Sequence, residues 1–172
     1  MQVGYENTKL SGLVASGRGF GAKTVHTQQA FIQKLIGGAP YPGTLNILLE
    51  QPILLKKAHK LDLKGKLFGV EATINGVPCL LYRFNYSPLH VLEVISTVHL
   101  RNELELLDGS EVEISILGDC IAKPSNWRCR LWRLFYADRL DAYYRDYMHQ
   151  LFTSKGFKFL HKIACQSKRE FR

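Results

Sequence analysis

The stretch Lys66–Asn85, "KLFGVEATINGVPCLLYRFN", decides the class of fold that this chain can adopt. Two apolar runs flank the dipeptide Asn75–Gly76, which is typical of a two-residue hairpin turn because both of its positions take positive φ. We therefore predict two antiparallel strands joined by a tight turn. Another strand signal is the segment 111–117, "EVEISIL", which follows an Asp108–Gly109 turn. Its strict alternation of polar and apolar residues is typical of a strand with one buried face.

Two apolar runs nearer the N-terminus predict further strands, at 10–15 and at 45–50, "LNILLE". The strands are short and numerous, and turn residues separate them. This pattern favours a barrel over a fold in which strands and helices alternate. Residues 1–118 are therefore predicted to form a mainly β domain.

Two short helices are expected among these strands. Thr27 is a suitable N-cap for the first helix, and Gly37–Gly38 is a suitable stop. Ser87 and Pro88 suit the cap and the first turn of the second helix. The expected apolar faces comprise Ala30, Phe31, Lys34 and Leu35 in the first helix, and Leu89, Leu92 and Ile95 in the second.

The chemical character changes after Gly118, so we predict a second part, a helical extension at 119–172. The extension holds twelve Lys or Arg and five Asp or Glu residues, so it accounts for +7 of the chain's net charge of +8. The segment 127–152 lacks Gly and Pro and has the spacing of an amphipathic helix, and a final short helix is expected after Gly156. The apolar face of the long helix would comprise Trp132, Tyr136, Leu140, Tyr143, Tyr147 and Leu151.

The role of this basic, aromatic extension is open at the level of sequence. Packing against the barrel, or contact between copies in a homo-oligomer, is the plainest reading. A basic amphipathic helix can also bind an anionic membrane surface or a nucleic acid. Salt-dependent binding that is lost on truncation after Gly118 would favour one of the latter two.

The bulk composition limits the remaining possibilities. The chain of 172 residues is 46% hydrophobic, which is typical of a globular protein with a packed core. No apolar run approaches the ~18 residues of a membrane span, and the first ten residues lack the features of a signal peptide. The four cysteines are scattered without a CxxC pair, which favours reduced thiols over a metal site or a disulfide framework. We therefore expect a cytoplasmic protein.

Two short motifs have the chemistry to bind a phosphorylated ligand. The segment 16–23, "SGRGFGAK", has glycines that allow close approach of the backbone to an anion and ends in a cation, although a plain flexible turn has the same composition. In "PGTLN" at 42–46, a turn delivers Thr44 and Asn46 to the same side of a strand start. Their two neutral oxygens suit a phosphate-bound Mg²⁺. The alternative is a turn whose polar side chains bond their own backbone.

Glu93 and Arg101 are the charged candidates. Glu93 falls in the second expected helix, where it either faces solvent or serves as a carboxylate of the site. Arg101 follows in "HLR", where its guanidinium could reach a phosphate or a base. Each residue taken singly is also compatible with an ordinary surface position.

Taken in order, the glycine loop, "PYPGTLN" and "HVLEVISTVHLRNELELLDGSEVEISI" resemble the archaeal-type CTP-dependent riboflavin kinases over residues 10–117. The resemblance implies a six-stranded cradle-loop (Greek-key) β-barrel. It also implies transfer of the γ-phosphate of CTP to the 5′-hydroxyl of riboflavin, giving FMN and CDP, with Mg²⁺ as the cofactor. Such a transfer depends mainly on positioning and charge neutralisation, which these motifs can supply.

The same resemblance implies roles for individual residues. Glu93 would orient or deprotonate the attacking hydroxyl, as a catalytic residue. The other implied roles are nucleotide binding by Gly17, Arg18, Gly19, Phe20, Gly21, Ala22 and Lys23 and by Val98, His99, Leu100 and Arg101, metal binding by Thr44 and Asn46, and flavin binding by Asn85 and Glu93.

Two positions in the loop depart from the family's usual pattern. Phe20 stands where an acid is usual, and Ala22 stands where a basic residue is common, although Lys23 follows one place later. The expected function is a CTP-dependent riboflavin kinase. The alternatives are a nucleotide- or flavin-binding barrel that has lost turnover, and a kinase that uses CTP on a different hydroxyl substrate.

Overall fold

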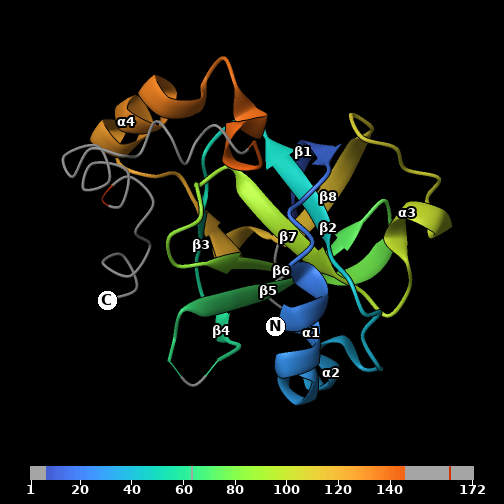
Figure 1. Ribbon diagram of the computed structural model, residues 1–172. Coiled ribbons are helices and arrows are strands. Elements are labelled where there is room, and N and C mark those ends of the chain that lie inside the picture. The colour runs from blue at the N-terminus through green and yellow to red at the C-terminus, as the bar shows by residue number, and fades with distance from the viewer. Residues whose placement is uncertain (1–6, 63, 146–162, 164–172) are drawn as a thin grey trace.

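Six strands close into a barrel in the computed structural model, which describes residues 7–62, 64–145 and 163 (Figure 1). The barrel strands are β1 (Asn7–Ala15), β2 (Leu45–Leu49), β5 (Leu67–Ile74), β6 (Val77–Phe84), β7 (Val91–Ile95) and β8 (Glu111–Leu117). Each pairs antiparallel with two neighbours in the order β5-β6-β7-β2-β1-β8, and β8 returns to pair with β5. The predicted mainly β, six-stranded barrel is therefore confirmed.

The predicted hairpin turn joins β5 to β6. Asn75 and Gly76 have φ angles of 47° and 84°, and the residues on either side of them, Ile74 and Val77, are paired across the ladder. Gly109, in the turn before β8, has a φ of 86°. These positions need the left-handed region, which glycine and asparagine tolerate best, so the local sequence determines where the chain reverses.

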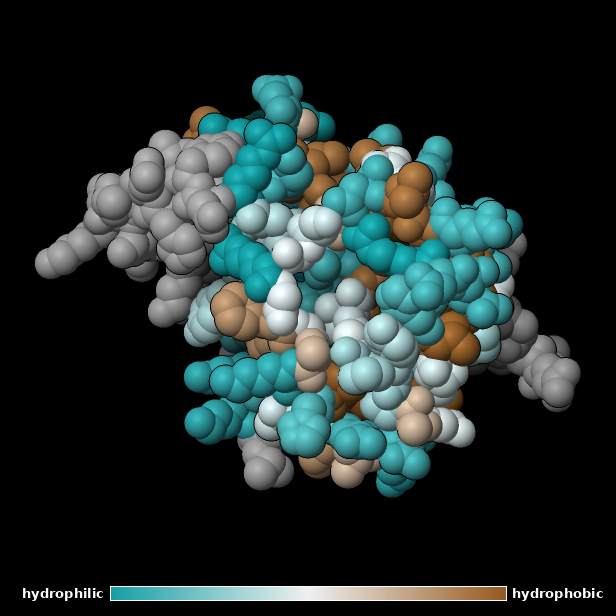
Figure 2. Space-filling view, turned by 45° about the vertical axis from the view of Figure 1, so that its right-hand side comes forward, coloured by the Kyte–Doolittle hydropathy of each residue, from teal (hydrophilic) through white to brown (hydrophobic). Residues whose placement is uncertain are grey.

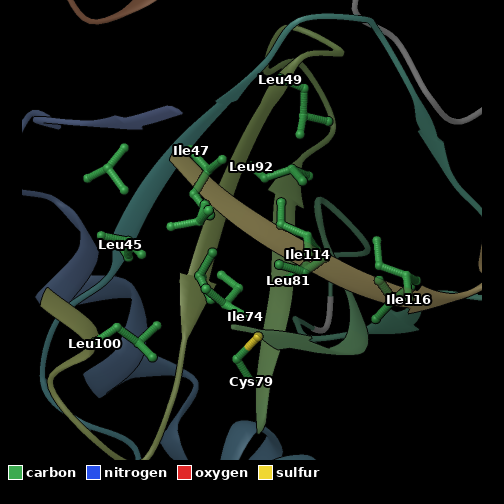
Figure 3. Close-up of a cluster of buried hydrophobic side chains, with 14 of the residues drawn as sticks. Leu45, Ile47, Leu49, Ile74, Cys79, Leu81, Leu92, Leu100, Ile114 and Ile116 are labelled. Carbon is green, nitrogen blue, oxygen red and sulfur yellow. The ribbon is translucent and has the colours of Figure 1, made fainter. Parts of the chain in front are cut away.

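Alternate residues of the strands fill the interior of the barrel (Figure 3). In β8 the buried Val112, Ile114 and Ile116 alternate with the exposed Glu111 and Glu113, as predicted. The outer surface differs, because hydrophilic side chains predominate on the face shown in Figure 2 and hydrophobic ones form small patches. The core residues labelled in Figure 3 are Leu45, Ile47, Leu49, Ile74, Cys79, Leu81, Leu92, Leu100, Ile114 and Ile116.

Two helices, α1 (Gly21–Thr27) and α2 (Gln29–Ile36), follow the glycine-rich loop. The prediction that Thr27 caps a helix is wrong, because Thr27 is the last residue of α1 and its hydroxyl donates to the Lys23 carbonyl at 2.8 Å. The predicted stop is confirmed, since Gly37 caps α2 with a left-handed φ of 72°. Helix formation therefore begins at the glycine loop itself.

The face that α2 buries also differs from the prediction. Phe31 is 48% exposed, whereas Ile32 is fully buried in a cluster that includes Leu80 and Tyr82 of β6. Leu35 packs against this cluster as expected. The apolar outer side chains of β6 select which face of the helix is buried, and the spacing within a helix of eight residues cannot show this.

The second predicted helix, at 87–96, is wrong, because this segment contains β7. The strand lies between β2 and β6, so both edges of its backbone are hydrogen-bonded. Leu92 and Val94 point into the barrel, and Ile95 joins the cluster outside it. A short apolar run that is buried on both faces has no period, so its sequence does not distinguish helix from strand.

The remaining short elements are β4 (His59–Lys60), which pairs with β5, α3 (Leu100–Glu103) and the 3-10 turn η1 (Gly118–Cys120).

The extension begins with β9 (Ile121–Ala122), which pairs with β3 (Leu54–Leu55), and continues into α4 (Asn126–Tyr136). The predicted helix at 127–152 is too long, because α4 ends at Tyr136 and a 3-10 turn, η2 (Leu140–Tyr143), follows. None of the described helices is long and apolar enough to cross a bilayer. The predicted features outside the described residues are Tyr147, Leu151 and the helix after Gly156.

A buried histidine, His90, holds the extension against the barrel. The Trp132 indole N–H donates to His90 Nδ1 at 2.8 Å, and His90 Nε2 donates to the Leu140 carbonyl, also at 2.8 Å. The Tyr136 ring lies 4.7 Å from the His90 ring, measured between centroids. Trp132 and Tyr136 are both buried, so they pack as the plainest reading of the sequence expected. Contact with a second copy, a membrane or a nucleic acid stays a prediction.

The His90 contacts make the stability of the fold depend on pH. Burial lowers the pKa of His90 from 6.5 to about 4, the bond to Leu140 opposes this lowering, and the positive charge of Arg83 adds to it. As the pH falls below 6.5, an unfolded histidine takes up a proton before the folded one does, so stability is lost down through pH 4. We expect His90 to lower the free energy of unfolding by about 2 kcal/mol between pH 7 and pH 5. Urea unfolding at the two pH values measures this difference.

The exposed His59 provides the matched control for this measurement. We expect the variant His59→Gln to keep the dependence on pH and the variant His90→Gln to lose it. Equal dependence in both variants would contradict the role given to His90.

Candidate active site

A cavity of about 440 Å³ lies between the glycine-rich segment 16–22 and the barrel. Thr44 and Asn46 at the start of β2, and Glu93 in the middle of β7, line it from the barrel side. Arg101 lines it as well. The structure therefore brings together predicted residues from four segments that lie far apart in the sequence.

Strand register explains why the polar residues meet. Leu45 and Ile47 of β2 point into the barrel, so Asn46 between them points to the outer face. Asn46 pairs with Glu93 across the β2–β7 ladder, and Glu93 pairs with Tyr82 across the β6–β7 ladder. The three side chains form a row across three strands, which we call the polar row.

Two glycines bring the loop into contact with this face of the barrel. A Cβ atom on Gly17 would lie closer than 3.0 Å to the Asn46 amide, and one on Gly21 would lie closer than 3.0 Å to the Thr44 hydroxyl. Real Cβ atoms essentially never approach other heavy atoms so closely. The loop backbone can therefore rest on Thr44 and Asn46 only because glycine occupies both positions.

Glu93 is the titratable centre of the site. The Tyr82 hydroxyl donates a hydrogen bond to its carboxylate, and the Thr44 hydroxyl lies 3.4 Å from the same oxygen as a second donor. Burial raises the pKa of Glu93, and these two hydrogen bonds oppose the rise. Burial and the charge of Glu93 also raise the pKa of Tyr82, so the phenol stays protonated as a donor. A carboxylate with a raised pKa is a stronger base than an ordinary glutamate, which suits a proton acceptor.

A second hollow, of about 260 Å³, adjoins the first and shares Gly43, Thr44 and Arg101 with it. The predicted nucleotide-binding segment 98–101 lines this second hollow. There the His99 ring stacks on the Tyr41 ring with 4.6 Å between centroids. The predicted binding residues thus lie around two adjoining hollows that meet at Thr44.

Arg101 ties the glycine loop to the turn before β8. Its guanidinium donates to the Ala15 carbonyl at 3.1 Å and to an Asp108 carboxylate oxygen at 2.6 Å. The Ser16 hydroxyl donates to the other Asp108 oxygen at 2.5 Å. The hydrogen bond from Ser16, and then that from Arg101, hold the pKa of Asp108 below its usual value. Arg101 therefore positions the start of the loop as well as lining both hollows.

Two predicted site residues lie outside both hollows. Lys23 is exposed on α1. Asn85 is buried just after β6, where its backbone N–H donates to the Lys66 carbonyl at 2.8 Å. Asn85 and Glu93, which were expected to share a flavin-facing surface, are therefore not brought into one cavity. Their expected roles stay predictions.

Six residues that line the first cavity or bond Glu93 were not predicted as site residues from the sequence, and Gly43 is one of them. Ser16 and Phe84 line the first cavity together with two tyrosines from the extension. The Tyr82 hydroxyl donates a hydrogen bond to the Glu93 carboxylate from the neighbouring strand β6. The hairpin register could have identified Tyr82, because it alternates with the inward-facing Leu81. Nothing in the local sequence identifies the two tyrosines, since they reach the cavity only through the docking of α4. They are Tyr143 and Tyr144.

The oxygen donors at the start of β2 suit a hard cation. Thr44 and Asn46 offer two neutral oxygens beside the carboxylate of Glu93. Mg²⁺ commonly takes one or two carboxylates, keeps several waters and shares the remaining positions with substrate phosphates. Within the described part of the chain, no group of three or more His, Cys, Asp or Glu side chains could hold a metal by itself. These residues therefore fit a cation that arrives with a phosphorylated ligand.

A closed antiparallel barrel with a carboxylate-containing cavity under a glycine loop defines the class of this protein, a β-barrel with a polar cavity on its wall. Residues 14–116 match the model of a family labelled CTP-dep_RFKase and described as domain of unknown function DUF120. The chain belongs to this family.

Similar proteins from archaea carry the name riboflavin kinase. The protein of Methanocorpusculum labreanum is 36% identical in an alignment 132 residues long that covers 64% of this chain and 58% of that protein. The protein of Staphylothermus marinus is 34% identical in an alignment 118 residues long that covers 63% of this chain and 91% of that protein. The protein of Pyrobaculum islandicum is 35% identical in an alignment 127 residues long that covers 63% of this chain and 60% of that protein. The match to the first and third of these relatives thus spans about three fifths of their length.

Proposed function

We propose that this protein is a riboflavin kinase that transfers the γ-phosphate of CTP to the 5′-hydroxyl of riboflavin, giving FMN and CDP. The similar proteins named riboflavin kinase support the reaction, and the family label supports CTP as the donor. In this reaction the flavin hydroxyl oxygen forms a bond to the γ-phosphorus. The bond from that phosphorus to the β,γ-bridging oxygen breaks, CDP leaves, and the hydroxyl proton is lost.

One observation carries the proposal, namely the glycine loop folded directly onto Thr44 and Asn46. The loop backbone and the two side chains then line the same cavity side by side, so both could contact the phosphate groups of one bound ligand. Thr44 and Asn46 would hold Mg²⁺, which when bound would neutralise charge on the transferring phosphate. Positioning and charge neutralisation are the main requirements of phosphoryl transfer.

Glu93 is the proposed acceptor of the hydroxyl proton. Its carboxylate lines the cavity, and burial raises its pKa. Tyr82 and Thr44 both donate to it, so its orientation is held from two directions. Arg18 and Arg101 also line the cavity and supply positive charge near the phosphates.

Direct measurement of FMN tests the proposal. The full chain, incubated with riboflavin, CTP and Mg²⁺, is expected to produce FMN and CDP in equal amounts by chromatography. The variant Thr44→Ala is expected to lower turnover by about tenfold or more, because a positioned oxygen near the phosphates is lost. The matched control is Thr73→Ala on β5, which lies outside the cavity and should keep turnover. Absence of FMN with CTP, ATP or any other nucleoside triphosphate would reject the kinase.

A second candidate is a barrel that binds nucleotide or flavin without turnover. It is favoured by Phe20, which is 69% exposed in the loop where an acid is usual in the family. Under this alternative, CTP and riboflavin raise the melting temperature of the protein, but no FMN forms. The binding and turnover measurements together separate the two candidates.

We also propose a cytoplasmic location. Cys79, Cys120 and Cys129 are free thiols, which is typical of a reducing compartment. The predicted division into a barrel at 1–118 and an extension at 119–172, and any homo-oligomer, stay proposals.

A further inference from the structure

The extension reaches the candidate active site although it lies outside the family match. The match ends at residue 116, whereas Tyr143 and Tyr144 line the same cavity as the glycine loop and Glu93. Both tyrosines are partly buried, and their rings meet edge to face with 5.1 Å between centroids. A segment that follows the catalytic barrel in sequence therefore forms one wall of its cavity.

Independent contacts hold this wall in place. His90 bonds the Trp132 indole and the Leu140 carbonyl, so it fixes the chain on both sides of the turn between α4 and η2. Phe135 and Ala142 are buried in one cluster with Trp132. The two tyrosines follow directly after this anchored segment. The docking of the extension therefore brings both tyrosines to the cavity.

Tyr144 acts on Asn46. Its hydroxyl donates to Asn46 Oδ1 at 3.2 Å. An ordinary tyrosine hydroxyl is protonated at neutral pH, so it can act as the donor in this bond. An amide oxygen has two lone pairs, so one remains for a second partner. The hydrogen bond therefore fixes the orientation of the Asn46 amide, so that its oxygen lies toward Tyr144 and the cavity.

Tyr143 acts on Arg18 in the glycine loop. The Arg18 guanidinium lies over the Tyr143 ring, 5.0 Å from its centroid, and it also donates to the Tyr143 carbonyl. A guanidinium has five N–H donors, so others remain for an anion. The ring and the carbonyl together restrict where this otherwise flexible cation can lie.

We propose that Tyr143 and Tyr144 are positioning residues of the active site, which orient Arg18 and the Asn46 amide toward a metal-bound nucleoside triphosphate. This inference rests on the proposed function, because it concerns how the same site binds its phosphate donor. Tyr144 would affect the binding of Mg²⁺-bound CTP, because it orients Asn46. Tyr143 would affect the binding of the phosphates themselves, because it orients Arg18. The two tyrosines therefore differ in whether their effect needs Mg²⁺.

The test uses calorimetric binding of CTP to the full chain, with and without Mg²⁺, and of riboflavin alone. For Tyr144→Phe we expect about fivefold weaker binding of CTP in the presence of Mg²⁺, the loss typical of one hydrogen bond, and unchanged binding of riboflavin. For Tyr143→Leu we expect weaker binding of CTP both with and without Mg²⁺. In turnover, Tyr144→Phe should raise the KM for CTP and leave the KM for riboflavin unchanged. Tyr86→Phe is the matched control, since Tyr86 is exposed and lines neither hollow.

The outcomes separate this inference from the proposed function. Equal weakening of CTP and riboflavin binding in Tyr144→Phe would indicate a merely structural role and overturn the inference. Tighter binding of CTP in either variant would also overturn it, because the tyrosines would then obstruct the site. If the wild-type chain forms no FMN, the proposed function fails, yet the comparison of CTP binding still decides the inference.

Discussion

Replacing Gly21 by alanine is expected to lower turnover of riboflavin about 100-fold, the cost of displacing reacting groups by about 1 Å. The new methyl group would lie closer than 3.0 Å to the Thr44 hydroxyl, and its next neighbours are also atoms of Thr44. The Thr44 hydroxyl is hydrogen-bonded to the Glu93 carboxylate, so we expect the loop, and not Thr44, to move away. Steady-state FMN formation measures the loss, and calorimetric CTP binding should weaken in parallel.

Gly19 offers the matched control within the same loop. A Cβ atom there meets nothing within 4 Å, although its φ of 77° makes alanine cost about 1 kcal/mol in backbone strain. We therefore expect Gly19→Ala to retain far more turnover than Gly21→Ala. The reverse order would show that the loop does not rest on Thr44 in the active protein.

Replacing Glu93 by glutamine is expected to lower kcat about 1,000-fold, within the range that a positioned general base contributes. Because burial raises the pKa of Glu93, the wild-type kcat should rise with pH through a value above that of an ordinary glutamate. The variant should lack this rise. Initial rates between pH 5 and pH 9, at saturating CTP and riboflavin, give both quantities.

Stability measurements separate this loss from misfolding. A carboxylate whose pKa is raised in the folded state destabilises the fold as pH rises through that value, so Glu93→Gln should not lower the melting temperature at pH 7. Its amide oxygen can still accept from Tyr82 and Thr44. Glu71→Gln, at an exposed position on β5, is the control that should keep full turnover. Full turnover in Glu93→Gln at neutral pH would contradict the role of base.

Local sequence predicted the positions of the turns better than it predicted whether the segments between them are helices or strands. The Asn75–Gly76 and Asp108–Gly109 turns were correct, because positive φ is a property of single residues. The alternation in 111–117 was also correct, since β8 has one face in the core and one in solvent. The segment 87–96 was assigned wrongly, because side chains on both faces of β7 are buried, Leu92 and Val94 in the barrel core and Ile95 in the cluster outside it.

The candidate site was only partly accessible from the sequence. The glycine loop and the pair Thr44 and Asn46 could be selected for their chemistry and their spacing. That they touch each other follows from the folding of the loop back onto β2, a contact between distant parts of the chain. Tyr82 enters through strand register, which is set by pairing and not by the composition of β6.

The sequence by itself determined the barrel class, its hairpin turns and the chemical types of the candidate site residues, because these depend on local conformational preferences and on functional groups. The tertiary structure alone decided that Tyr82, Glu93 and Asn46 form one polar row, since cross-strand register is a non-local property. The tertiary structure also decided that α4 ends at Tyr136 and that the Tyr144 hydroxyl reaches the Asn46 amide. The physical reason is the buried His90, whose two ring nitrogens bind the extension at two points and so direct it into the site.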